Sequence, residues 1–177
     1  MNLQFWKKSS TGPDAAASLA GLVLAHAAWS VSDLPEGELL VPLAMIEKAG
    51  QRELHRFEAE TQEQAIAEGK AAMGQLSGSV DAWAFAREGQ FNEGSGYVDV
   101  LSIDAWAKGM TASISFVQKF RPFASGKFEL LGEPLVVIAG ESQNPSASSD
   151  LLTKLARAIQ SHPKAAEHWS EWFVKTN

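Results

Sequence analysis

The chain contains no cysteine and carries a deficit of positive charge. Without cysteine, a disulfide framework, thiol catalysis and zinc–thiolate sites are excluded together. Its 15 Lys and Arg stand against 21 Asp and Glu, which gives a formal net charge of −6 at pH 7. A face that binds nucleic acid needs a clustered basic stripe. We therefore expect no nucleic acid among the partners of this protein.

The sequence also lacks the motifs that identify common enzyme and cofactor sites. It has no G-x-S-x-G elbow, no G-x-G-x-x-G fingerprint and no Walker A loop. Its four histidines are His26, His55, His162 and His168. None of them has the i, i+3 or i, i+4 helical spacing of a zinc site, so we expect no metal and no cofactor. His26, in an Ala-rich segment, is expected to be a hydrogen-bonded packing residue.

A long apolar run is missing as well. Residues 15–25 are apolar but Ala-rich, and this run is too short to span a bilayer. We expect a soluble, cytoplasmic protein that does not bind membranes. The alternative is export, because Lys7 and Lys8 precede the apolar run and Ala25-His26-Ala27 has the A-x-A pattern of a signal-peptide cleavage site.

What the sequence does contain is a series of β-rich segments at 80–139. The connections are a Gly-rich loop at 88–96 and two short turns, Lys108-Gly109 and Ser125-Gly126. Glycine supplies the positive φ that tight hairpin turns require. The spacing therefore predicts four consecutive antiparallel strands.

These turns also predict which residues face each other and which share a face of the sheet. The predicted pairs are Trp106 with Thr111, Ile103 with Ile114, Leu101 with Phe116, Phe120 with Leu131, Trp83 with Leu101, and Phe85 with Asp99. One predicted face is aromatic and apolar, with Trp83, Phe85, Tyr97, Leu101, Ile103, Ile114, Phe116, Phe120 and Leu131. The other has small residues, with Ala82, Ala84, Ala86, Val98, Val100, Ser102, Ser115 and Val117. We expect both faces to be covered.

The flanking segments predict helices and one further hairpin. These are a helix at 15–29 capped by Asp14, a hairpin with the turn Ala49-Gly50, a helix at 62–76 capped by Thr61, a helix at 151–160 capped by Ser149 or Asp150, and a last helix from Pro163. Pro42 and Pro134 indicate strands at an edge or a bulge, and Gly69 and Gly74 indicate close packing of their helix. The fold class is therefore α+β, a single domain over 1–177 with about six mainly antiparallel strands, in the order α-β-β-α-β-β-β-β-α-α.

The candidate site lies on the aromatic face, where the predicted register sets Asp99 beside Gln118 and near Phe85. A carboxylate there would be costly to bury unless it were hydrogen-bonded or solvated. Asp99 is then at a wet margin of the face, or is a satisfied structural acid, or anchors an aromatic-lined ligand pocket. Tyr97 and His55 complete the set of candidate ligand-binding residues.

The C-terminal helix carries a second candidate surface, the cluster of Trp169, Trp172 and Phe173. It either folds back onto the core or forms an interface with a protein partner, such as a homodimer contact. With no catalytic constellation in the sequence, we expect a non-enzymatic domain that binds a protein or small molecule. The alternative is a small acid–base enzyme that uses carboxylates and His55.

Overall fold

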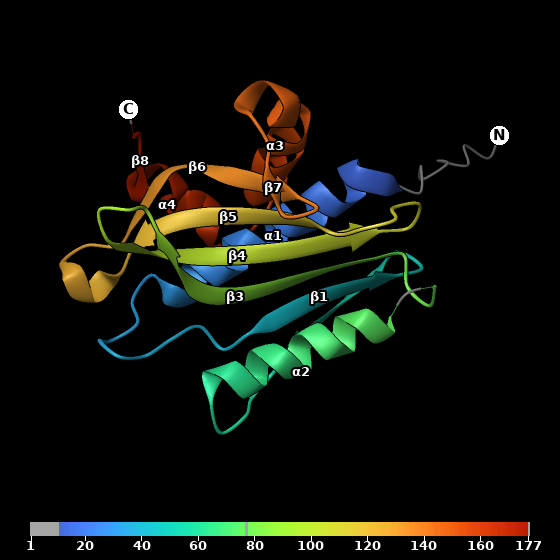
Figure 1. Ribbon diagram of the computed structural model, residues 1–177, viewed down its shortest axis with the longest axis horizontal. Helices are drawn as coiled ribbons and strands as arrows, with labels where there is room; N and C mark the ends of the chain where they lie inside the picture. The colour runs from blue at the N-terminus through green and yellow to red at the C-terminus, as the bar shows by residue number, and fades with distance from the viewer. Residues whose placement is uncertain (1–10, 77, 177) are drawn as a thin grey trace.

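The computed structural model describes residues 11–76 and 78–176, shown in Figure 1. Its elements are α1 (Gly12–Val31), β1 (Leu43–Lys48), β2 (Gln51–Arg56), α2 (Gln62–Gln75), β3 (Ala82–Asn92), β4 (Tyr97–Ala107), β5 (Ile114–Arg121), the short 3-10 helix η1 (Phe123–Ser125), β6 (Glu129–Ile138), β7 (Glu141–Ser142), α3 (Pro145–Ile159), α4 (Ala165–Trp172) and β8 (Phe173–Val174). The predicted α+β class is confirmed. The two-residue strands β7 and β8 add to the six strands that were expected.

A single sheet organises the molecule, with the strand order β2-β1-β3-β4-β5-β6-β7. Neighbouring strands along this path are antiparallel, and β8 adds a parallel pairing to β6. Figure 1 shows α1 running behind the sheet and α2 lying along β1 and β3 on its other side. The helices α3 and α4 pack on the α1 side at the β6 end, and this arrangement buries the main core.

Helix α1 forms the centre of that core. Its alanines are almost all buried, and at Gly21 an added Cβ would stand 2.3 Å from the backbone oxygen of Leu155 in α3. Among the described helices α1 alone is long and apolar enough to cross a membrane, yet 67 % of its most apolar window is buried within the fold. A core helix and a signal sequence both fit that composition.

Two of the predicted helix starts are wrong for the same physical reason. Helix α1 begins at Gly12 with Thr11 at the N-cap, so Asp14 lies in the first turn. Helix α3 is capped by Asn144, whose Oδ1 accepts the Ala147 N–H at 2.8 Å, rather than by Ser149 or Asp150. In both helices a proline occupies the first turn, where its fixed φ and missing N–H favour initiation.

The hairpin of β1 and β2 has the predicted register. Glu47 faces Arg52, with 2.8 Å between Oε2 and Nε, and Ala49 and Gly50 turn with φ of 52° and 76°. The edge position inferred from Pro42 is wrong, because β1 lies between β2 and β3 and the proline precedes its ladder.

The predicted pairing of β3 with β4 is wrong by an odd number of residues. Phe85 faces Asp104 instead of Asp99, and Ala84 faces Ala105. An odd shift exchanges the faces of a strand, so the β3 alanines join the apolar β4 residues under α1. Phe85 instead faces α2, packing with Ala44 and Met73.

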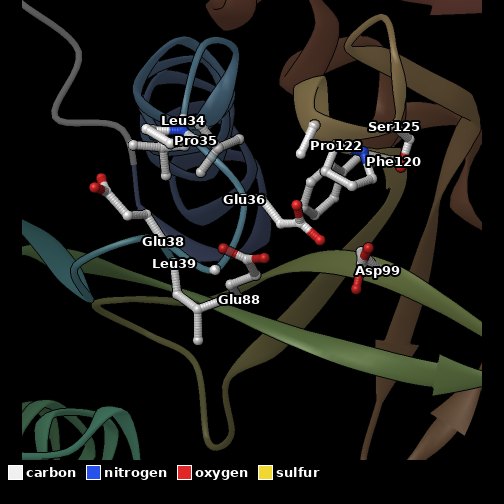
Figure 2. A pocket seen from close by; sticks show the side chains of 13 residues that line it. Leu34, Pro35, Glu36, Glu38, Leu39, Glu88, Asp99, Phe120, Pro122 and Ser125 are labelled. Atoms are coloured by element: carbon white, nitrogen blue, oxygen red, sulfur yellow. The ribbon is translucent and has the colours of Figure 1, made fainter.

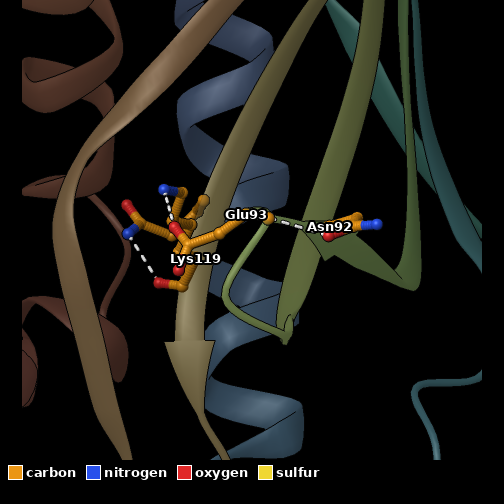
Figure 3. A network of polar contacts seen from close by, with 5 residues as sticks. Asn92, Glu93 and Lys119 are labelled. Atoms are coloured by element: carbon orange, nitrogen blue, oxygen red, sulfur yellow. Dashed lines mark hydrogen bonds and ion pairs between the residues drawn. The ribbon is translucent and has the colours of Figure 1, made fainter.

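The cause of this shift is that β3 extends through residues 88–92, which were predicted to lie in the loop, whereas β4 begins at Tyr97 as predicted. Asn92 pairs with Tyr97, so only a short turn remains, and Asn92 Oδ1 accepts the Gly94 N–H at 2.8 Å. An ion pair between Glu93 in this turn and Lys119 of β5 holds the turn against β5, as Figure 3 shows.

The other two predicted registers differ less. Between β4 and β5, Ile103 faces Phe116 instead of Ile114, a shift of two residues that leaves the faces unchanged. Between β5 and β6, Phe120 faces Leu130 rather than Leu131, because η1 lengthens the turn. This odd shift of one residue places Leu131 beside Lys119, on the face opposite Phe120, so its predicted place on the aromatic face is wrong.

The ladder of β5 and β6 is also interrupted by a bulge. Val117 pairs with Leu135 and Lys119 with Leu131, so residues 132–134 stand opposite Gln118 alone. The bulge predicted at Pro134 is therefore present.

Helix α2 begins as predicted, with the Thr61 hydroxyl accepting the Gln64 N–H at 3.2 Å. It covers the sheet face opposite α1, and Gly69 sits against the ring of Phe85. The close packing predicted at Gly69 is thus confirmed and is made to an aromatic ring, whereas the close packing predicted at Gly74 is wrong, because no atom lies within 4 Å of its added Cβ.

Candidate functional site

The structure disperses the five candidate ligand-binding residues. Asp99 and Gln118 share the α1 face of the sheet, where they face Phe120 and Leu101 respectively. Phe85 is 1 % exposed on the opposite face, Tyr97 is 73 % exposed at the start of β4, and His55 is exposed on the edge strand β2. The predicted neighbourhood of Asp99 and Phe85 is wrong because of the odd register shift. Two separate hollows contain Asp99 and Gln118.

Asp99 lines a hollow of about 250 Å³ that we call the acidic pocket. Its walls come from the loop after α1, from β3 and β4, and from the end of β5 with the turn that follows. The lining residues are Val31, Leu34, Pro35, Glu36, Gly37, Glu38, Leu39, Glu88, Asp99, Phe120, Pro122, Ala124 and Ser125.

Three carboxylates converge in this pocket. Figure 2 shows the side chains of Glu36, Glu88 and Asp99 turned toward the hollow, whereas Glu38 points away from it. The Leu40 N–H donates to Glu88 Oε2 at 2.8 Å, and Gln90 Nε2 donates to Asp99 Oδ1 at 3.3 Å. These bonds orient two acids but neutralise neither.

Electrostatics distinguish Glu88 from the other acids. Burial raises the pKa of Glu88, the negative charge of Asp99 raises it further, and the hydrogen bond from Leu40 opposes the rise. No Lys, Arg or His occurs among the described lining residues. The pocket therefore gathers several acidic side chains, and burial raises the pKa of one of them, Glu88.

Gln118 lines a second hollow, of about 300 Å³, between α3, α4 and β6, which we call the Gln118 cleft. It is mostly apolar and also contains Trp169 and Phe173. Trp169 and Trp172 pack against the main core, and the Trp172 ring meets Phe128 edge-on at 5.2 Å. All three residues of the predicted C-terminal cluster are half-buried against the body of the protein.

A third polar group lies on the α2 face of the sheet. Arg87 pairs with Asp104, and the Ser115 hydroxyl donates to the same carboxylate at 2.6 Å. The sequence did not indicate this cluster, because it depends on the register that was mispredicted. Its one negative and one positive charge are paired with each other, so the cluster has no net charge to attract a charged ligand.

The last polar group is a pair of histidines. His26 Nδ1 lies 3.3 Å from His162 Nε2, and His162 Nδ1 accepts the Ala165 N–H at 3.0 Å. Since a neutral imidazole carries one N–H, His162 must hold its proton on Nε2 and donate it to His26. Burial lowers the pKa of both rings, and the nearby His162 and Arg56 lower that of His26 further.

This pair agrees with the packing role expected for His26. Among the described residues there is no group of three or more His, Cys, Asp or Glu that could hold a metal ion. The pair therefore offers an incomplete ligand set.

Comparison with known proteins adds no functional assignment: no family model, no curated protein and no solved structure matches this chain. The function must therefore be argued from the geometry of the acidic pocket and the Gln118 cleft.

Proposed function

We propose that this protein binds a small cationic organic molecule, of the alkylammonium class, in the acidic pocket and does not catalyse its conversion. The observation that carries the proposal is the convergence of Glu36, Glu88 and Asp99 with no cation among the described lining residues. A ligand with a positive charge would supply the missing partner. This role retains Asp99 as the polar anchor of an aromatic-lined pocket.

The pocket walls favour an organic cation over a bare metal ion. Phe120, Pro122 and Leu34 provide apolar surface beside the carboxylates. Such a surface stabilises a hydrocarbon chain by removing it from water, whereas a metal ion would gain nothing from it. The formal net charge of −6 would also attract cations over a longer range.

An acid–base enzyme is the second candidate, and one observation favours it. The raised pKa of Glu88 beside Asp99 is the property that a general acid requires. In this version Glu88 replaces His55, which lies exposed on β2 beside Glu53, outside the pocket. A panel of p-nitrophenyl esters and glycosides would test it: turnover abolished by Glu88→Gln and kept by Glu53→Gln would favour the enzyme.

Titration calorimetry with n-pentylammonium and 1-pentanol tests the binding proposal. We expect the amine to bind at least tenfold more tightly than the alcohol at pH 7, and Glu88→Gln or Asp99→Asn to weaken it by about tenfold, since each removes a charge-assisted contact. Glu53→Gln, which removes an exposed carboxylate elsewhere, is the matched control and should change nothing.

The affinity should also rise with pH as Glu88 loses its proton, because the ammonium pairs with the carboxylate. Equal binding of amine and alcohol, or equal effects of Glu53→Gln and Asp99→Asn, would refute the proposal.

We propose further that the protein is cytoplasmic and that it forms a homodimer. The cytoplasmic location is supported by α1, because 67 % of its most apolar window is buried within the fold, as in a core helix. A second copy would pair with β2, the edge strand of the sheet, whose six residues are all exposed. Light scattering that gives the mass of one chain in solution would rule the dimer out.

A further inference from the structure

The Gln118 cleft owes its polar base to the bulge between β5 and β6. At Gly132, with φ of 70°, the β6 backbone leaves the ladder with β5, in which Gly132 has no partner. There the Gln118 side chain takes the place of a strand partner: its Nε2 donates hydrogen bonds to the carbonyl oxygens of Lys119 and Gly132, at 2.9 and 3.0 Å. Bulges of this kind are enriched next to functional sites, where they redirect a side chain.

This arrangement uses both amide hydrogens of Gln118 and leaves its oxygen as an acceptor. The amide orientation is determined by its partners, since an oxygen in the place of Nε2 would face two carbonyl oxygens. Among the described residues, no hydrogen bond reaches Gln118 Oε1, and no side-chain nitrogen or oxygen is sealed from solvent without a partner. The 1 % of Gln118 that remains exposed must therefore include Oε1, at the base of the cleft that it lines.

The walls next to Gln118 are apolar and partly aromatic, and the polar lining residues Glu133, Gln160 and Ser170 lie exposed at the rim. Leu155 and Ile159 of α3 form a buried wall, and the half-buried rings of Trp169 and Phe173 lie on the α4–β8 side. A volume of about 300 Å³ suits a ligand of one or two rings. Planar ligands fit such walls, because aromatic groups gain edge and face contacts with Trp and Phe.

Charge at the rim restricts the ligand further. Glu133 is exposed there, and the described lining residues include no Lys, Arg or His. An anion would find a like charge and no counter-charge. A neutral ligand that brings a hydrogen-bond donor would satisfy Oε1, whereas one that brings only an acceptor would leave two acceptors unpaired.

We infer that the Gln118 cleft is a second binding site, for a neutral planar aromatic molecule of the indole class whose N–H donates to Gln118 Oε1. This inference does not depend on the acidic pocket, which takes a cation through a different set of residues.

The test uses indole and benzofuran, two probes of nearly equal size in which an N–H replaces a ring oxygen. Binding to the full-length protein would be followed by titration calorimetry or ligand-observed NMR. We expect indole to bind about tenfold more tightly than benzofuran, the difference made by one buried hydrogen bond.

Blocking variants locate the site without disturbing Gln118. Ala156 lies exposed at the mouth of the cleft, so Ala156→Phe should fill the entrance and weaken indole binding at least tenfold. Ala147→Phe makes the same exchange at an exposed position of the same helix outside the cleft, and should leave binding unchanged. Thermal unfolding of both variants would verify that they are folded.

Three outcomes would overturn the inference: no binding of indole, equal affinity for the two probes, or indole binding that survives Ala156→Phe. Asp99→Asn separates this site from the proposed function. It should weaken n-pentylammonium and leave indole unaffected, so each site can fail without the other.

Discussion

Replacing Gly69 by alanine tests how closely α2 approaches the sheet. A Cβ at this position would stand 2.3 Å from Cε2 and 2.6 Å from Cζ of Phe85, and 3.2 Å from Cδ2 of Phe57. An ordinary contact begins at 3.4 Å, so the Phe85 ring would have to retreat by about 1 Å. That ring is 1 % exposed and already meets Phe57 edge-on at 5.8 Å, which leaves it little room.

The magnitude follows from two opposing effects. Overpacking a well-packed core costs about 1–3 kcal/mol, and alanine is preferred over glycine inside a helix by about 1 kcal/mol. A retreat of about 1 Å by a buried ring places the cost in the upper part of that range, about 2–3 kcal/mol, so we expect Gly69→Ala to lower the free energy of unfolding by about 1–2 kcal/mol. Gly74→Ala is the matched control, because α2 also contains Gly74 and no atom lies within 4 Å of its added Cβ. There only the helix preference acts, and stability should rise by about 0.5–1 kcal/mol.

Urea denaturation followed by tryptophan fluorescence measures both changes. The two variants should shift the midpoint in opposite directions at an unchanged m-value, and the melting temperature should move by about 2–4 °C per kcal/mol. Gly21→Ala extends the series, since its Cβ would meet the backbone oxygen of Leu155 at 2.3 Å and a backbone atom cannot rotate away. It should destabilise more than Gly69→Ala. Should Gly69→Ala prove as stable as the parent, the packing argument is wrong.

The remaining predictions concern pH and helix capping. Burial lowers the pKa of His26 and His162 below the ordinary 6.5. As the pH falls, the histidines of the unfolded chain are therefore protonated before those of the folded chain. The contribution of the pair to the free energy of unfolding is full above pH 6.5 and is lost as the pH falls further. Urea midpoints at pH 7.5 and 5.5 should therefore differ less in His162→Gln than in the parent or in His55→Gln; an identical pH dependence in all three would contradict this. Asn144→Ala should cost about 1 kcal/mol by removing the α3 cap, and Asp150→Ala less than about 0.5 kcal/mol. Equal losses in those two variants would place the cap elsewhere.

The elements that the sequence predicted correctly depend on neighbours within a few residues. The turn at Ala49-Gly50 sets the register of its own hairpin, and Thr61 caps α2 through a bond to Gln64 three residues away. Such local interactions form in the same way whatever the fold of the rest of the chain. Where two local signals compete, as Pro13 and Asp14 do, the helix start follows the proline.

The candidate site was predicted only in part. Asp99 was identified as a polar group near an aromatic wall, and it does line a pocket with Phe120. Glu88 was missed because it had been assigned to a loop, whereas β3 extends through it. Glu36 could not be placed, since its loop reaches the pocket only through the packing of α1.

By itself the sequence determined the α+β class, the turn at Ala49-Gly50, the Thr61 cap and the alternation of side chains along each strand, because these follow from steric and hydrogen-bonding preferences of adjacent residues. Only the tertiary structure decided which faces meet. The observed register of β3 and β4 differs from the predicted one by five residues, which places Phe85 on the sheet face opposite Asp99. In the folded chain His26 also lies beside His162, although 136 positions separate them in the sequence. The strand registers and the contacts between distant residues are set by the burial of the whole core, which no short segment of the sequence encodes.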